Sequence, residues 1–307
     1  MKDWRRGVWV AMVTPWDPGA SRPRGYALEA LVERFVAAGV HGLYVLGTTG
    51  EGTLLSLEER EGFLEDVLST ARGRLPVIVH TGHDSTDAVV RLSLHAREAG
   101  AVAVAVAPPT RYRLDQQELF QHYAAVAEAL GDFPLLLYDI PGTTCNPLGA
   151  WLLSRLRGSF ANVVGAKVSR SDWEAWCGYL SLREDVTLFV GVDEMVLPLI
   201  AAGAQGLISS LANIFPELYV ALYRTIEAGE LVRARELQRL VWELADICHR
   251  GSPLAYVKSS LSLLGVEVGP PLPPLRDLGA EERETLRERL HEFRIRLEDL
   301  MVKGGGS

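Results

Sequence analysis

The chain has 307 residues, 48% hydrophobic and 23% charged, a composition typical of a globular protein with a large core. A net charge of −8, with acids and arginines interspersed, disfavours nucleic acid as a partner, and the longest apolar run is too short to cross a membrane. Three scattered cysteines, with no CxxC pair and no signal-peptide pattern at the N-terminus, predict a cytoplasmic protein without a disulfide framework.

Short runs rich in Val, Ile and Leu alternate with longer segments of helical period along the first two thirds of the chain. Their near-continuous apolar character fits parallel strands that are covered on both faces. The predicted strands are Val8–Thr14, Gly42–Leu46, Pro76–Thr81, Ala101–Ala107, Pro134–Tyr138, Val163–Lys167, Thr187–Val192 and Gly206–Ser210.

The intervening segments are predicted to be helices. Ser56 and Glu59 form a capping-box pattern, and Gly100 is a stop signal. The predicted helices are Ala27–Ala38, Leu57–Ala71, Ser85–Ala99, Leu114–Leu130, Pro147–Leu156, Asp172–Leu182 and Glu194–Ala202. This α/β alternation predicts a (β/α)8 TIM barrel. A doubly wound open sheet is the alternative, but no GxGxxG follows the first strand.

After the eighth strand the pattern becomes purely helical, over Pro216–Glu227, Leu231–His249, Leu254–Leu264 and Glu281–Met301. We expect a barrel over residues 1–225, a small C-terminal helical appendage over 226–303, and a flexible Gly-rich tail over 304–307.

One of only four lysines, Lys167, lies in a predicted buried strand. Lys2 and Lys303 are terminal, and Lys258 falls in a helical pattern from which we expect it to reach water. A buried ammonium is costly unless it is paired or loses its proton, and a neutral lysine is a nucleophile for carbonyl carbon. The residues leave two interpretations open: a Schiff-base lysine, or a lysine that snorkels or pairs with a buried carboxylate.

Two further strand ends carry polar groups, where barrel enzymes place their sites. Residues Gly47 to Gly52 offer glycine N–H groups and the hydroxyls of Thr48 and Thr49, which suit one small carboxylate. Tyr138 ends the fifth strand beside the strand of Lys167, within expected hydrogen-bond reach of its amine, and a phenol there can carry protons. The alternatives are an ordinary polar turn and a tyrosine that caps the core with a wet hydroxyl.

Taken together, these motifs resemble the dihydrodipicolinate synthase / N-acetylneuraminate lyase family of class I pyruvate-dependent aldolases. The resemblance extends from about Gly7 to about Leu300. The stretches that carry it are GLYVLGTTGE at 42–51, YDIP at 138–141, VGAK at 164–167, GAQGLIS at 203–209 and VKSSL at 257–261.

The resemblance implies a role for each matching residue. Lys167 would form the Schiff base with a 2-keto acid, and Tyr138 and Thr48 would relay protons. Thr49 and the amides from Gly47 to Gly50 would hold the carboxylate, and the Ile208 carbonyl would line the pocket. It also implies pyruvate as the small-molecule partner and a homo-tetramer or dimer, with no cofactor.

Three positions depart from the family pattern. Thr143 stands where synthases usually carry an arginine, which argues against a true dihydrodipicolinate synthase. Arg111 stands near the place of a family Tyr-Tyr pair, where it would bind an acidic substrate, lie at a subunit contact or simply be solvated. His80 and His83 replace small residues after the third strand and are candidates for substrate contact.

His80, His83 and Asp84 also permit a metal-site interpretation, but their spacing is loose and we expect no metal. The leading hypothesis is a class I lyase that cleaves or forms a C–C bond of a 2-keto-3-deoxy sugar acid or related hydroxylated 2-keto acid. Dihydrodipicolinate synthase, a Schiff-base dehydratase and a non-catalytic pyruvate sensor stay open as alternatives.

Overall fold

The computed structural model describes residues 3–17, 22–23 and 25–304. Gly304, expected in the flexible tail, is the last residue of a helix, and residues 305–307 lie outside the described part of the chain.

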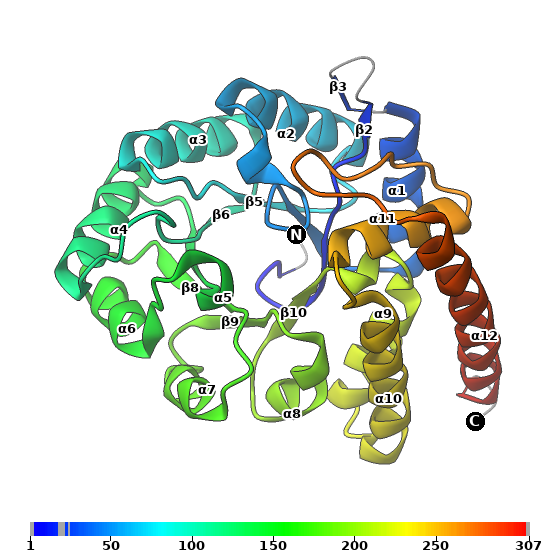
Figure 1. The fold of residues 1–307 in the computed structure, drawn as a ribbon. Coiled ribbons are helices and arrows are strands. Elements are labelled where there is room, and N and C mark those ends of the chain that lie inside the picture. Colours follow the sequence, from blue (N-terminus) through cyan, green and yellow to red (C-terminus); the bar gives the residue numbers. More distant parts are fainter. Residues whose placement is uncertain (1–2, 18–21, 24, 305–307) are drawn as a thin grey trace.

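Eight parallel strands close into a barrel in chain order, as predicted (Figure 1). The first strand pairs with both its successor and the last strand, which closes the ring. The strands are β1 (Gly7–Ala11), β4 (Gly42–Val45), β5 (Val77–His80), β6 (Ala103–Val106), β7 (Leu135–Asp139), β8 (Val163–Val168), β9 (Thr187–Val190) and β10 (Gly206–Ser209). Each overlaps a predicted strand, although most are shorter by one to several residues.

A ring of helices surrounds the strands (Figure 1). These are α1 (Gly25–Ala38), α2 (Leu57–Ala71), α3 (Thr86–Ala99), α4 (Gln116–Leu130), α6 (Gly149–Ser159), α7 (Trp173–Leu180), α8 (Val196–Ala201) and α9 (Pro216–Glu227). The capping box of Ser56 and Glu59 is formed at α2, and Gly100 ends α3 with a φ of 99°. Both signals therefore set helix ends as predicted.

Several short elements have no counterpart in the prediction. They are the antiparallel pair β2 (Trp16–Asp17) and β3 (Arg22–Pro23), the single turn α5 (Pro141–Thr144), and the 3-10 turns η1 (Gly52–Leu54) and η3 (Leu211–Asn213). A third 3-10 turn, η2 (Asp193–Met195), overlaps the start of the predicted helix Glu194–Ala202. Elements of two to four residues are too short to show a period in the sequence.

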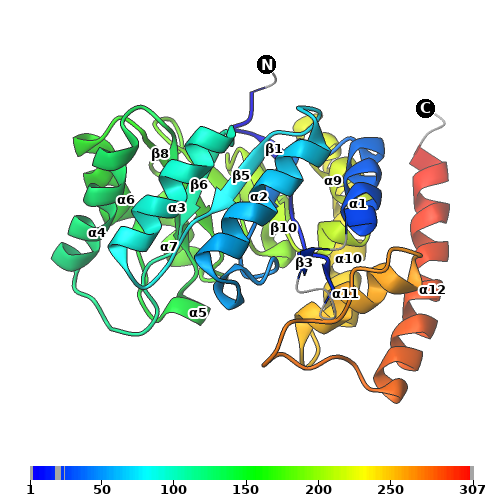
Figure 2. The ribbon, with the colours of Figure 1, turned by 90° about the horizontal axis from the view of Figure 1, so that it is seen from above.

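The remaining helices, α10 (Leu231–Cys248), α11 (Pro253–Leu263) and α12 (Ala280–Gly304), pack along one side of the barrel beside α9 (Figure 1). The loop between α11 and α12 lies at the same end of the barrel as α5, opposite the N-terminus (Figure 2). This is the end at which the strands finish.

Large side chains fill the barrel interior, so no channel runs through it. Trp9 and Phe189 meet edge to face, with ring centroids 6.1 Å apart, and Tyr44, Leu136 and Ile208 belong to the same buried cluster. Within the described residues, no helix combines the length and apolar character that a membrane span needs.

Candidate active site

The amine of Lys167 lies inside the barrel, against two aromatic rings. Lys167 is a β8 residue, 5% exposed, and pairs in register with Tyr138 of β7. Its Nζ lies 4.2 Å from the ring centroid of Tyr44 and 4.3 Å from that of Tyr138. No ion-pair partner of Nζ is present among the described residues. The two side chains are neighbours, as expected, but Nζ lies over the ring of Tyr138. The hydrogen-bonding approach to the phenol oxygen is not seen among the described residues and stays a prediction.

The prediction for Lys258 was wrong, because this lysine is as buried as Lys167. It is 1% exposed, forms an ion pair with Glu51, and donates to the Pro270 carbonyl at 3.1 Å. Burial lowers its pKa, although the carboxylate of Glu51 opposes the shift. Burial alone does not single out Lys167. What distinguishes Lys167 is that no carboxylate of the described residues pairs with its buried amine.

The turn that follows β4 is held in a left-handed backbone conformation at both ends. Leu46 has a φ of 61° and Glu51 a φ of 56°, values that are costly for residues with a side chain. Between them, Gly50 packs so closely that a Cβ there would lie 2.8 Å from the Leu46 nitrogen. The hydroxyl of Thr14 donates to the Gly50 carbonyl at 2.6 Å. The conformation of this turn is thus fixed by its surroundings.

The C-terminal part of the chain completes this support. Glu51 accepts a hydrogen bond from the Leu272 amide at 2.5 Å, in addition to its ion pair with Lys258. Both partners belong to α11 and the loop after it. The helices that follow the barrel therefore hold the turn that was predicted to bind a carboxylate.

A cavity of about 430 Å³ opens at the C-terminal ends of the strands. Its wall includes five of the predicted site residues, Thr48, His80, His83, Tyr138 and Thr143, and also Leu275 from the α11–α12 loop. Lys167 is not one of the lining residues, but its Nζ lies against the ring of Tyr138, which is. The structure thus brings together residues from four separate predicted strand ends.

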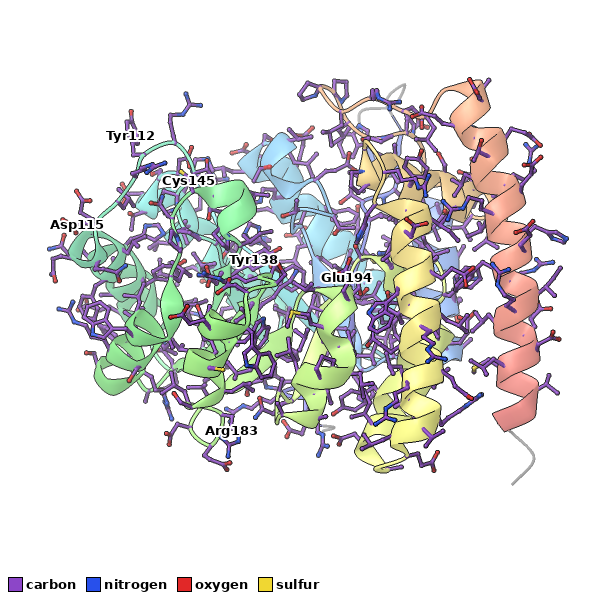
Figure 3. The ribbon with its side chains drawn as sticks, turned by 60° about the horizontal axis from the view of Figure 1, so that its bottom comes forward. Tyr112, Asp115, Tyr138, Cys145, Arg183 and Glu194 are labelled. Atoms are coloured by element: carbon purple, nitrogen blue, oxygen red, sulfur yellow. The ribbon has the colours of Figure 1, made fainter. Side chains whose placement is uncertain are left out.

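Five other predicted site residues are not part of the cavity wall: Gly47, Thr49, Gly50, Ile208 and Arg111. Thr49, Gly47 and Gly50 lie in the turn beside Thr48. Ile208 is 1% exposed within the barrel interior. Arg111 is exposed on the loop before α4, with its Nε 3.9 Å from Asp84. Figure 3 shows its neighbour Tyr112 at the outer edge of the molecule, whereas Tyr138 lies inside.

His80 connects the cavity to the β4 turn. Its Nδ1 lies 3.1 Å from the Leu46 carbonyl, and its ring is edge-on to that of Tyr138 with centroids 5.7 Å apart. Burial, with a further contribution from the Arg60 charge, lowers the pKa of His80 to about 3. The ring is therefore neutral across the physiological range.

His83 and Asp84, the other members of the possible metal group, have separate local partners. His83 accepts from the Ser85 amide at 3.0 Å, and Asp84 accepts from the amide and hydroxyl of Thr110 at 2.6 and 2.8 Å. Among the residues that the structure describes, no group of three His, Cys, Asp or Glu side chains is placed to hold a metal ion.

Arg60 and Tyr44 were missed by the sequence reasoning. Arg60 is 1% exposed, donates to the carbonyls of His80 and Gly82 at 2.8 and 3.1 Å, and also lines the cavity. Its signal was a charged residue on the apolar face of α2, in step with Phe63 and Val67. Tyr44 carried no such signal, because it is one more buried strand residue.

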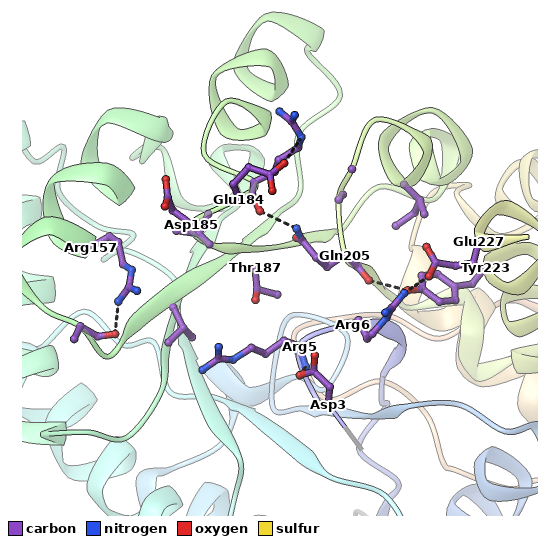
Figure 4. Close-up of a pocket in the computed structure, with 17 residues that line it drawn as sticks. Asp3, Arg5, Arg6, Arg157, Glu184, Asp185, Thr187, Gln205, Tyr223 and Glu227 are labelled. Carbon is purple, nitrogen blue, oxygen red and sulfur yellow. Dashed lines mark hydrogen bonds and ion pairs between the residues drawn. The ribbon is translucent and has the colours of Figure 1, made fainter. Parts of the chain in front are cut away.

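A second hollow, of about 460 Å³, lies at the opposite end of the barrel (Figure 4). Two of its arginines have acidic partners: Arg6 pairs with Glu227, and Arg183 with Glu184 at 3.3 Å. Among the described residues that line it there is no lysine and no histidine. The lysine and histidine predicted as site residues therefore lie at the C-terminal end of the barrel and not at this hollow.

Three comparisons with known proteins agree with this geometry. The model of the Dihydrodipicolinate synthetase family matches residues 5–293. The 4-hydroxy-tetrahydrodipicolinate synthase of Methanopyrus kandleri is 34% identical, over 97% of this chain and 98% of its own length. The N-acetylneuraminate lyase of Rhizobium meliloti is 33% identical, over 92% of this chain and 93% of its own. The solved structure of a catalytic lysine mutant of Ruminococcus gnavus sialic acid aldolase superposes with a TM-score of 0.90 at 28% identity, covering 99% of both chains.

Proposed function

The chain belongs to the dihydrodipicolinate synthetase family and is a lyase of the Schiff-base aldolase class, and from this premise we propose that it cleaves or forms a C–C bond of a hydroxylated 2-keto acid through Lys167. The observation that carries the proposal is the amine of Lys167, which is buried, has no carboxylate partner among the described residues, and lies against the cavity wall. The sialic acid aldolase to which the chain is similar has a catalytic lysine.

In the cleavage direction, the neutral amine adds to the C2 carbonyl of the substrate, and water leaves as the iminium forms. The C3–C4 bond then breaks, and its electron pair moves into the iminium to give an enamine. The C4 hydroxyl loses its proton and becomes the aldehyde product. Protonation of the enamine carbon and hydrolysis of the imine release pyruvate and restore the amine.

Tyr138 is the group best placed to carry these protons, since it lines the cavity and adjoins Lys167. The turn at Thr48 and Thr49 supplies hydroxyls and N–H groups for the substrate carboxylate, which aligns the keto carbon with the amine. Its supported backbone is suited to such alignment, because little reorganisation is needed on binding.

A 2-keto-3-deoxy sugar acid is our proposed substrate class. Thr143, a cavity residue, stands where the resembling synthases usually have an arginine, so one guanidinium for a second carboxylate is missing. The second candidate is 4-hydroxy-tetrahydrodipicolinate synthase, which is favoured by the similarity to the Methanopyrus enzyme over nearly its whole length.

The decisive experiment is borohydride reduction in the presence of pyruvate, followed by intact and peptide mass analysis. We expect one adduct, located on Lys167. Aldol cleavage of 2-keto-3-deoxygluconate is then measured beside formation of 4-hydroxy-tetrahydrodipicolinate, and the larger kcat/KM decides between the two candidates. An adduct elsewhere, or none, would rule out the mechanism.

We also propose a cytoplasmic homo-tetramer or dimer, as the family resemblance implies. Light scattering after size-exclusion chromatography measures the state directly, and a single monomeric species would contradict this part of the proposal.

A further inference from the structure

We propose that His80 selects a hydroxyl group on the substrate, beyond the keto carbon, by accepting its hydrogen bond at Nε2. This inference rests on the proposed function and names the group that recognises the polar part of the substrate. It is carried by four features: the tautomer of the ring, the lack of a partner at Nε2, the glycine beside it, and its position relative to Lys167.

The hydrogen bond at Nδ1 fixes the tautomer. The atom 3.1 Å from Nδ1 is the Leu46 carbonyl oxygen, which can only accept, so Nδ1 carries the proton. In the neutral ring the other nitrogen, Nε2, then has a free lone pair and acts only as an acceptor. The low pKa described above keeps the ring in this state.

The acceptor at Nε2 has no hydrogen-bond partner within the described residues, although it is buried. A buried polar atom without a partner costs about 1–3 kcal/mol, and native proteins seldom leave one without a reason. A ligand that donates a hydrogen bond here removes that cost. A ligand that does not donate leaves it in place, which is how a polar site discriminates between substrates.

Gly82 lies directly against this buried nitrogen and leaves no room for a side chain of its own. A Cβ at Gly82 would lie 2.7 Å from Nε2 and 3.0 Å from the backbone of Ala107. The φ of Gly82 lies outside the left-handed range, so space rather than backbone conformation requires the glycine. Gly82 and His80 both line the cavity, and Nε2 therefore lies directly beneath its wall.

The ring is placed where the middle of a substrate would lie. Tyr138 contacts Lys167 on one side and His80 on the other, at 4.3 Å to Nζ and 5.7 Å between ring centroids. A 2-keto acid bonded to Nζ must extend past Tyr138 into the cavity. Its carbons beyond the keto group then pass His80, whereas pyruvate itself is too short to do so.

The charges around Nε2 restrict the donor to a neutral group. A carboxylate or carbonyl oxygen would face the lone pair of Nε2 and be repelled. An ammonium donor would face Arg60, a buried guanidinium that donates to the His80 carbonyl and has no acidic partner among the described residues. A hydroxyl meets both conditions, as it donates to Nε2 and bears no charge.

Two substitutions separate this role from the support that His80 gives to the β4 turn. His80→Asn retains a donor in the place of Nδ1 and removes the distant acceptor. His80→Gln retains an acceptor near the place of Nε2 and removes the donor to Leu46. Gly82→Ala is a third variant, in which the added Cβ must displace the His80 ring and so takes Nε2 from its place.

The probes are 2-keto-3-deoxygluconate and 2-oxohexanoate, which share a six-carbon 2-keto acid skeleton and differ in their hydroxyls. The concentration that gives half-maximal borohydride trapping is measured for each, counting all adducts on Lys167, with pyruvate as a short control. In the natural sequence we expect the hydroxylated acid to be trapped at a lower concentration.

In His80→Asn and Gly82→Ala this preference, taken relative to pyruvate trapping in the same variant, should fall by about tenfold, which corresponds to the loss of one hydrogen bond. His80→Gln should keep the preference and weaken all three acids alike. An unchanged preference in His80→Asn, or none in the natural sequence, overturns the inference and leaves the imine mechanism intact. Absence of any adduct overturns the proposed function itself.

Discussion

The two ends of the barrel have cavities of similar volume, but within the described part of the chain the polar groups are paired and exposed at one end and buried without partners at the other. At the N-terminal end, two arginines pair with carboxylates in exposed positions: Arg183 with Glu184, and Arg6 with Glu227 (Figure 4). At the C-terminal end, Nζ of Lys167 lies over two rings without an acid, and Nε2 of His80 and the hydroxyl of Tyr44 have no partner among the described residues. The difference favours the C-terminal end as the proposed site of reaction, because polar groups are buried and left unpaired there, whereas solvent screens the charges at the other end.

The largest expected effect comes from Lys167→Arg. Arginine keeps the positive charge but does not act as a nucleophile, so turnover should fall to background and no borohydride adduct should form. Steady-state assays and intact mass measure both, and circular dichroism shows whether the fold is kept. Arg5→Lys, at the N-terminal hollow, is the matched exchange and should leave kcat unchanged. An active Lys167→Arg enzyme would show that the amine of Lys167 is not needed for turnover, and the C-terminal end would lose its proposed reactive group.

Tyr138→Phe should reduce kcat by about 10²–10⁴-fold, since it removes a proton carrier and leaves the ring against Lys167. Imine trapping with pyruvate should survive, so that chemistry and imine formation are separated in one variant. Tyr223→Phe removes a phenol that lines the N-terminal hollow and serves as the control. A normal kcat in Tyr138→Phe would show that another group moves the protons.

Lys258→Met should lower the free energy of unfolding by about 3–5 kcal/mol, because it leaves the Glu51 carboxylate buried without its cation. Urea denaturation measures the change. The double variant Lys258→Met, Glu51→Gln should recover part of it, and KM for pyruvate should rise in the single variant through the disturbed turn. Equal losses in the single and double variants would mean that the pair does not act as a unit.

Acid should destabilise the C-terminal end selectively through His80. Its folded-state pKa of about 3 lies below the ordinary value of 6.5, so the unfolded chain binds the proton first as the pH falls. The stabilisation is complete above pH 6.5 and is lost progressively between pH 6.5 and pH 3. By pH 5 the free energy of unfolding should have fallen by about 2 kcal/mol. Urea titrations at pH 7.5 and 5 should show a smaller difference for His80→Asn than for the natural sequence. If the two proteins lost the same free energy of unfolding between pH 7.5 and pH 5, the proton would be taken up elsewhere. One such place is His122, whose pKa is lowered by burial to about 4.

The smallest effect should come from Arg183→Ala at the N-terminal end. Its partner Glu184 is largely exposed, and such pairs contribute about 0–1 kcal/mol. The free energy of unfolding and the KM for pyruvate should both be nearly unchanged. The change in the free energy of unfolding between pH 7.5 and pH 5 should also be the same as in the natural sequence. A clear rise in KM for pyruvate would show that the N-terminal end affects substrate binding, and the two ends of the barrel could then not be treated as independent.

The barrel could be predicted because its signals are local. Apolar runs such as Ala103–Val106, the capping box at Ser56 and the stop at Gly100 act over a few residues. The meeting of Lys167 with Tyr138 followed from the adjacency of consecutive strands in a parallel barrel.

What could not be predicted depends on partners far along the chain. Nothing around Lys258 reveals that Glu51 and the Pro270 carbonyl enclose it, so its periodic position suggested solvent. The ring faces of Tyr44 beneath Nζ and the orphaned nitrogen of His80 are likewise products of packing, which no spacing in the sequence encodes.

Because the loop after α11 helps to form this cavity, the order in which the chain is synthesised affects when the cavity can be completed. All eight strands have been translated by Ser209, but Lys258 and Leu272, which secure Glu51, and Leu275, which closes the cavity wall, come much later. A nascent chain on the ribosome can therefore assemble its strands while the mouth above Lys167 is still unfinished. This cavity is among the last parts of the molecule to be completed, and a chain released early would carry Lys167 without the residues that secure the turn after β4.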